Sequence, residues 1–255
     1  MTGPVEPATM DDVSELRRRE VRTYFDVIAR GGSDRLLDAR SFHNLGEYTA
    51  DDFARVADLL VDAGGSGGFA FLGRDADLYA DTIADLADEG HEIVLHGHRH
   101  VACADVSYDV AHDNLGRGIE AIEDAAGVTP TGFFAPLQEL SQGTLDAAAD
   151  LGLDWLLGTT EGDLPTGIEL VEPHNPYDLV LLNQGEAPED AFADLADAAD
   201  PGTAFLFHPN MLDYYDAFAE FEAWVADAQP VSIGEFVDDG GVGIVVDAMR
   251  PLRIA

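Results

Sequence analysis

The sequence predicts a distorted (β/α) barrel of about seven parallel strands. Apolar runs of about four to seven residues alternate along the chain with helical patterns of about ten residues or more. Helical crossovers of this kind join parallel strands, and 255 residues suit one barrel. Neither Gly-x-Gly-x-x-Gly after the first strand nor Gly-x-x-x-x-Gly-Lys occurs, which disfavours a nucleotide-binding open sheet. We expect a single domain over residues 1–255, with a helical extension at 1–33.

Start and stop signals place the elements in order. The first helix carries an apolar stripe and stops at Gly31-Gly32, Thr49 caps the second helix, and Gly64 and Gly90 close the second and third. The expected helices are 11–30, 49–64, 79–90, 108–126, 142–151, 188–199 and 212–228. The expected strands are 35–39, 68–73, 92–96, 132–135, 153–157, 178–182, 203–207 and 242–247.

The chain is strongly acidic. It has 50 Asp and Glu residues against 13 basic residues, all of them Arg, and a formal net charge of −37. Such a charge repels phosphate backbones and anionic lipid surfaces, so neither nucleic acid nor a membrane is expected as a partner. The acids are spread over many helix faces, which indicates a halophilic protein adapted to a high-salt cytoplasm rather than an acidic binding tail.

Three further features indicate a cytoplasmic location. No apolar stretch approaches the roughly 20 residues that a membrane-spanning helix needs. The first 30 residues lack the basic start and apolar run of a secretory signal. The single cysteine, Cys103, cannot form a disulfide within the chain.

Three of the eight histidines lie within five residues, directly after an apolar strand. His96, His98 and His100 follow Ile93-Val-Leu95, and the carboxyl ends of parallel strands carry the active sites of α/β folds. Imidazole is the commonest metal ligand, and two imidazoles plus a carboxylate leave a position on Zn²⁺ open for water. The sequence therefore predicts a metal site at the end of this strand.

The segment Glu89-Gly-His-Glu-Ile-Val-Leu-His-Gly-His-Arg-His100 closely resembles the polysaccharide deacetylase (NodB-homology) family, carbohydrate esterase family four. The resemblance implies a NodB-type barrel in which His96 and His100 bind a divalent metal, Zn or alternatively Co, Mn or Ni. Similarity extends from about Arg35 to Phe236. The stretch Ala204-Phe-Leu-Phe-His208 is similar to the family's strand that carries the general acid, which implies that role for His208.

Two motifs of the family are incomplete in this chain. The motif Arg-Pro-Tyr has become Ala-Pro-Leu, so that only Pro136 remains, and we assign Pro136 and His98 to substrate binding. The motif Thr-Phe-Asp-Asp, which supplies the base and a third metal ligand, is absent. One register places His43 at the base and Asn44 at the ligand position, whereas another uses Asp38. His98 is a further alternative for the third ligand.

The resemblance implies a metal-dependent hydrolase that removes an acyl (acetyl) group from an N- or O-acetylated carbohydrate or a related small amide. Such a hydrolase acts on C–N bonds other than peptide bonds. Its activity requires other residues to replace the base and the third metal ligand of the missing Thr-Phe-Asp-Asp motif. One alternative is a degenerate protein of the same fold that binds a glycan or another partner without turnover. Another is an amidohydrolase-type metal hydrolase in which His96-Gly-His98 forms the His-x-His motif.

Overall fold

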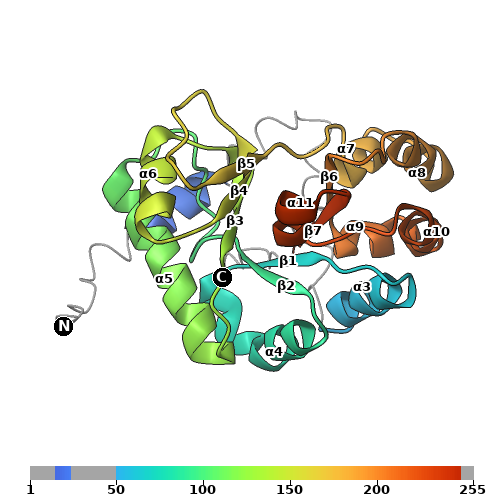
Figure 1. Cartoon of the computed structure of the whole chain (residues 1–255), viewed down its shortest axis with the longest axis horizontal. Coiled ribbons are helices and arrows are strands. Elements are labelled where there is room, and N and C mark those ends of the chain that lie inside the picture. The colour runs from blue at the N-terminus through green and yellow to red at the C-terminus, as the bar shows by residue number, and fades with distance from the viewer. Residues whose placement is uncertain (1–14, 24–49, 248–255) are drawn as a thin grey trace.

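The structure, a computed structural model, describes residues 15–23 and 50–247 (Figure 1). In this part of the chain seven strands form one parallel sheet in the order β5-β4-β3-β2-β1-β7-β6. An isolated bridge between Pro173 and Ala204 links the two outer edges, so the barrel is nearly closed and the predicted fold class is confirmed. The strands are β1 (Gly68–Phe71), β2 (Glu92–Leu95), β3 (Gly132–Glu139), β4 (Trp155–Thr159), β5 (Glu169–Val171), β6 (Thr203–Phe207) and β7 (Val242–Asp247).

Helices surround the sheet (Figure 1). Residues 15–23 are helical and precede them. None of the helices within the described ranges has the length and apolar character that crossing a bilayer requires. The helices are α3 (Ala50–Asp62), the 3₁₀ helix η1 (Gly73–Leu78), α4 (Ala80–Asp88), α5 (Tyr108–Ala126), α6 (Gln142–Asp150), α7 (Asp178–Asn183), α8 (Pro188–Asp197), α9 (Pro209–Tyr214), α10 (Phe218–Ala228) and α11 (Ile233–Asp239).

Most elements lie where the sequence predicts them, with three corrections. The strand predicted at 178–182 is wrong, because these residues form α7; a short apolar run fits a buried helix as well as a strand. The helix predicted at 212–228 is two helices, separated where Asp216 takes a left-handed φ of 54°. Strand β5 and helix α11 were not predicted. The strand predicted at 35–39 and the ends of the helix predicted at 11–30 lie outside the described residues.

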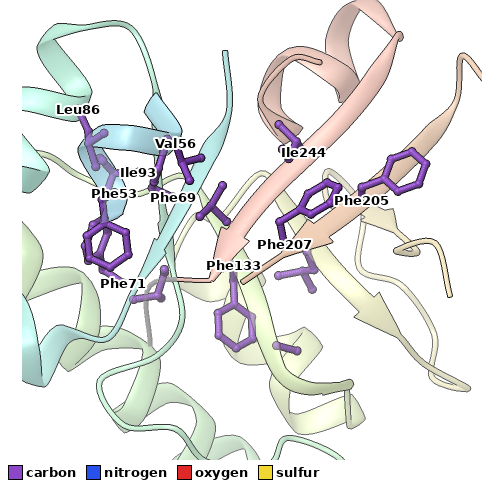
Figure 2. Close-up of a cluster of buried hydrophobic side chains, with 14 of the residues drawn as sticks. Phe53, Val56, Phe69, Phe71, Leu86, Ile93, Phe133, Phe205, Phe207 and Ile244 are labelled. Carbon is purple, nitrogen blue, oxygen red and sulfur yellow. The ribbon is translucent and has the colours of Figure 1, made fainter. Parts of the chain in front are cut away.

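Alternation along the strands divides the core into two layers. Phe69 and Phe71 of β1 belong to an outer cluster that packs against the surrounding helices (Figure 2). Ala70, between them, belongs to a second cluster with side chains from all seven strands and with Ile233 of α11. This second cluster fills the barrel interior, because successive strand residues point to opposite faces of a sheet.

Hydrogen bonds to Glu92 close the amino-terminal end of the barrel. Its carboxylate accepts from Trp155 Nε1 at 2.9 Å and from the Gly234 backbone N–H at 2.8 Å. Burial raises the pKa of Glu92 above its ordinary value. These bonds join β2, β4 and α11 at one end, and leave the carboxyl-terminal rim as the open end for a site.

Candidate metal and catalytic site

Three polar side chains stand at the carboxyl-terminal rim of the barrel. His96, His208 and Asp247 each lie two positions beyond an interior residue of β2, β6 and β7, respectively. Because strand residues alternate, all three point into the same rim layer. Their exposed fractions are 1%, 4% and 4%, so each is buried. The sequence predicted the two histidines as site residues but not Asp247.

The His96 imidazole is oriented as a metal ligand would be. Its Nδ1 lies 2.8 Å from the backbone carbonyl oxygen of Phe134, which can only accept, so Nδ1 carries the proton. Burial lowers the pKa of His96, which keeps the ring neutral. Its Nε2 is buried without a hydrogen-bond partner. A neutral imidazole held by a carbonyl through one nitrogen offers its other lone pair to a cation.

The His100 ring lies beside the His96 ring, with 5.0 Å between the ring centroids. This separation suits one cation with Zn–N bonds of about 2.0–2.1 Å to each ring. The loop between the two rings turns at Gly97, whose φ of +85° is strained for other residues. The Asn114 side chain holds this loop, accepting from Arg99 N at 2.9 Å and donating to Arg99 O at 3.1 Å.

The helix at 15–23 also holds the histidine loop. Glu20 is fully buried and accepts from the His100 backbone N–H at 3.2 Å and from Arg99 Nη1 at 2.9 Å. Its carboxylate also pairs with Arg74. Thr23 Oγ1 accepts the Ala102 backbone N–H at 2.9 Å. The N-terminal helix therefore fixes the segment that carries His100, a role the sequence did not reveal.

His98 lies on a different side of the loop from His96. Its Nδ1 is 3.1 Å from the point where a Cβ on Gly73 would stand, so its ring packs against the start of η1. Burial and the guanidinium groups of Arg99, Arg117 and Arg74 lower the pKa of His98 to about 4. The structure thus brings His96 and His100 together, while the assignment of His98 to substrate binding stays a prediction.

Pro136 lines a cavity of about 440 Å³ beside the histidine loop. Residues of the helix at 15–23, of 101–105 and of 136–139 form its walls, and none of the site histidines does. Strand β3 is irregular here, with positive φ angles of 60° and 64° at Leu137 and Gln138. The substrate-binding role of Pro136 stays a prediction, and its place in the cavity wall is compatible with that role.

His208 is paired with a carboxylate that the sequence did not single out. Asp178, fully buried at the start of α7, contacts His208 Nδ1 through Oδ1 at 2.9 Å and accepts the His208 backbone N–H through Oδ2 at 2.7 Å. The Tyr177 ring stacks on the His208 ring at 5.7 Å. Burial lowers the pKa of His208, but Asp178 and Asp247 raise it by more, so this pKa lies above its ordinary value. The raised pKa favours the protonated ring, whose Nε2 lies 3.6 Å from Asp247 Oδ2.

Replacing Asp178 by Asn should lower the pKa of His208, because the nearest negative charge disappears. A raised pKa stabilises the folded state below the unfolded pKa of about 6.5, and this contribution fades as the pH rises through the folded pKa. The variant should therefore lose most stability at acid pH and least at alkaline pH. NMR titration of the His208 ring in chelator-treated protein checks the first result, and unfolding at both pH extremes checks the second. An unchanged His208 pKa would contradict the pairing.

The described residues supply only part of a metal site. In the ranges 15–23 and 50–247, no three His, Cys, Asp or Glu side chains are close enough together to hold a metal ion. The unsatisfied Nε2 of His96, with His100 beside it, fits two of the donors that a catalytic zinc needs. Asp38, His43 and Asn44, predicted as base and third ligand, lie outside the described residues.

Comparison with known proteins identifies a related family. Residues 46–156 match the profile of the polysaccharide deacetylase family. The resemblance to that family is confirmed. A peptidoglycan deacetylase from Helicobacter pylori is 31% identical over 69 residues, which are 27% of this chain. The match to this curated deacetylase spans only about a quarter (24%) of its length.

Solved deacetylase-type structures share the fold. A polysaccharide deacetylase homologue from Mycobacterium smegmatis superposes with a TM-score of 0.59 at 21% identity, covering 84% of this chain and 81% of the other. A family-four pseudoenzyme from Bacillus anthracis gives a TM-score of 0.57 at 16% identity, covering 78% and 66%. At these identities the likeness establishes the deacetylase-type barrel and not an activity.

Proposed function

We propose that this polysaccharide deacetylase-like chain is a metal-dependent hydrolase that removes acetyl groups from an N- or O-acetylated carbohydrate or a related small amide. We propose, too, that residues 1–255 are one domain with a helical extension at 1–33. The cytoplasmic location and the halophilic character stay predictions from composition. The family match at 46–156 supports the class of reaction.

One observation carries the proposal: His96 and His208 are each fixed through Nδ1 by an acceptor, and each offers Nε2 at the same rim. The acceptor is a carbonyl oxygen for His96 and the Asp178 carboxylate for His208. The two rings have opposite properties, because burial lowers the pKa of His96 whereas Asp178 and Asp247 raise the pKa of His208. A neutral ring suits a metal ligand, and a protonated ring suits a general acid.

His96 and His100 would hold the cation, and a bound Zn²⁺ supplies Lewis-acid polarisation of the acyl carbonyl and a water of lowered pKa. Water adds to the acyl carbon and the C–N or C–O bond breaks, releasing acetate. The proton on His208 Nε2 passes to the leaving amine or alkoxide. Asp38 or His43 is proposed to accept the proton of the attacking water, and Pro136 to border the substrate.

A second candidate function is glycan binding without turnover. The absent Thr-Phe-Asp-Asp motif motivates it, and a pseudoenzyme from Bacillus anthracis shares the fold. The amidohydrolase alternative needs His96 and His98 on one cation. It has less support, because the Nδ1 of His98 faces Gly73 of η1, whereas the ring of His100 lies next to that of His96.

Zinc-loaded protein should release acetate from an N-acetylglucosamine oligomer or from O-acetylated xylan, and lose this activity in a chelator. His208→Ala should lower the rate by about 10²–10⁴-fold, because it removes the general acid. His112→Ala, a histidine on α5 with its ring against Tyr108, is the control and should keep full activity. Acetate release that persists in chelator would reject the metal, and glycan binding with no release would favour the second candidate.

A further inference from the structure

The strand β7 brings a second carboxylate to His208. β7 lies between β1 and β6, and its Val246 pairs in register with Phe207 of β6. The next residues on the two strands, Asp247 and His208, are therefore level with each other. On each strand the residue two positions earlier belongs to the interior cluster, so both side chains point into the same rim layer.

The His208 ring lies between two carboxylates. Asp178 Oδ1 lies 2.9 Å from Nδ1, and Asp247 Oδ2 lies 3.6 Å from Nε2. The two carboxylates come from different elements, α7 and β7, and both side chains are buried. A neutral imidazole has one N–H and one lone pair, so it would turn a lone pair toward one of the carboxylates. Only the doubly protonated ring presents an N–H to both.

The two contacts differ in length. Asp178 is fixed, because its Oδ2 accepts the His208 backbone N–H at 2.7 Å and its Oδ1 accepts the Leu179 backbone N–H at 2.6 Å. Its contact with Nδ1 therefore orients the ring. The 3.6 Å between Nε2 and Asp247 exceeds the length of an N–H···O hydrogen bond, which is about 2.7–3.2 Å. The Nε2 proton is thus attracted by a negative charge without being held in a hydrogen bond to it.

We infer that Asp247 is a positioning residue of His208, which keeps the proton on Nε2 until the leaving group of the substrate takes it. This inference rests on the proposed role of His208 as general acid. The leaving amine or alkoxide accepts the proton as its bond to the acyl carbon breaks, and the ring becomes neutral. Its Nε2 lone pair then faces a carboxylate, and this repulsion favours uptake of a new proton from solvent.

The titratable side chains that act on His208, in the part of the chain that the structure describes, come from three elements. Asp178 and Tyr177 lie at the start of α7, Asp247 on β7 and His96 at the end of β2. Burial, with the two aspartates, raises the pKa of Tyr177 to about 12, and burial lowers the pKa of His96, so both are neutral near pH 7. The two aspartates therefore set the charge around His208. Burial lowers the pKa of His208, but they raise it by more.

Asp247→Asn removes the charge and keeps the shape of the side chain. NMR titration of the His208 ring in chelator-treated protein should give a lower pKa than in the wild type. A general acid works only while it is protonated, so the alkaline limb of acetate release from an N-acetylglucosamine oligomer by the Zn²⁺-loaded protein should move to lower pH. On that limb the rate should fall about tenfold, a part of the about 10²–10⁴-fold that a general acid contributes. At acid pH it should stay within about twofold of the wild type.

Two further variants are controls. Asp239→Asn removes the same charge from an exposed position at the end of α11 and should leave the His208 pKa and the pH profile unchanged. Asp247→Glu keeps the charge on a longer side chain and should retain a raised His208 pKa. A role of Asp247 in packing alone predicts no such difference between the charged and the uncharged variant.

Two outcomes would overturn different claims. A His208 pKa that is equal in the wild type and in Asp247→Asn would overturn the inference, even if the wild type releases acetate. A wild type that releases no acetate with Zn²⁺ at any pH would count against the proposed function, while the titration still measures the coupling of His208 to Asp247. Thermal unfolding in chelator shows whether Asp247→Asn folds. If it does not, Asp247→Ser, which is smaller and also uncharged, is judged by the same two measurements.

Discussion

His96→Asn is expected to abolish tight metal binding while the barrel stays folded. The Asn side-chain amide can still donate to the Phe134 carbonyl oxygen, which the His96 Nδ1 reaches at 2.8 Å, but it has no counterpart to the Nε2 lone pair. Zn²⁺ affinity should fall by more than about 100-fold. The deacetylation rate should fall by about 10³-fold. A bound metal stabilises the transition state by several kcal/mol, and each 1.36 kcal/mol of lost stabilisation slows the reaction tenfold.

The His96→Asn variant is compared with His112→Ala by calorimetry, acetate release and thermal unfolding. His112 lies on α5 with its ring against Tyr108, so its loss should leave all three measurements near the wild type. If His96→Asn binds Zn²⁺ as tightly as His112→Ala does, His96 is no ligand and the proposed site is wrong. A loss of folding in His96→Asn would instead be visible as a lowered unfolding temperature in chelator.

The sequence predicts the fold well wherever a local signal is strong. Strands β6 and β7 and helix α5 match their predicted bounds, because β-branched or aromatic runs and a closing Gly127 mark them. The apolar run at 178–182 was predicted as a strand but forms helix α7. A short apolar run shows that a segment is buried in the fold, but it does not show whether the segment is a strand or a helix. The short strand β5 has only three residues and carries no periodicity to detect.

The histidines of the site are visible in the sequence, whereas its carboxylates are not. His96, His100 and His208 are three of only eight histidines, but Asp178 and Glu20 are two of 50 acids. Their burial results from contacts with residues 30 or more positions away, such as His208 for Asp178 and Arg99 for Glu20. Asp247 had a usable signal, because it ends an apolar strand in the same way as the histidines do.

Glu20→Ala is expected to cause a large loss of stability, because Glu20 is the common partner of two guanidinium groups. Breaking a buried ion pair by removing one partner costs about 3–5 kcal/mol. The Arg74 and Arg99 side chains are 12% and 19% exposed, so water recovers part of the loss and about 3 kcal/mol is expected. Thermal unfolding should occur about 6–12 °C lower. Zn²⁺ affinity should fall about tenfold, because His100 loses its backbone acceptor.

Glu15→Ala is the matched control, since it removes the same type of side chain five residues earlier on the same helix. Glu15 pairs with Arg19 at 2.9 Å and with Arg18 at 3.4 Å, but its side chain is 43% exposed. An exposed pair contributes only about 0–1 kcal/mol, so this variant should unfold close to the wild-type temperature. Equal destabilisation by both variants would mean that the helix stabilises the fold by packing alone. A larger effect of Glu20→Ala on both stability and Zn²⁺ affinity would show that this buried carboxylate couples the N-terminal helix to the histidine loop.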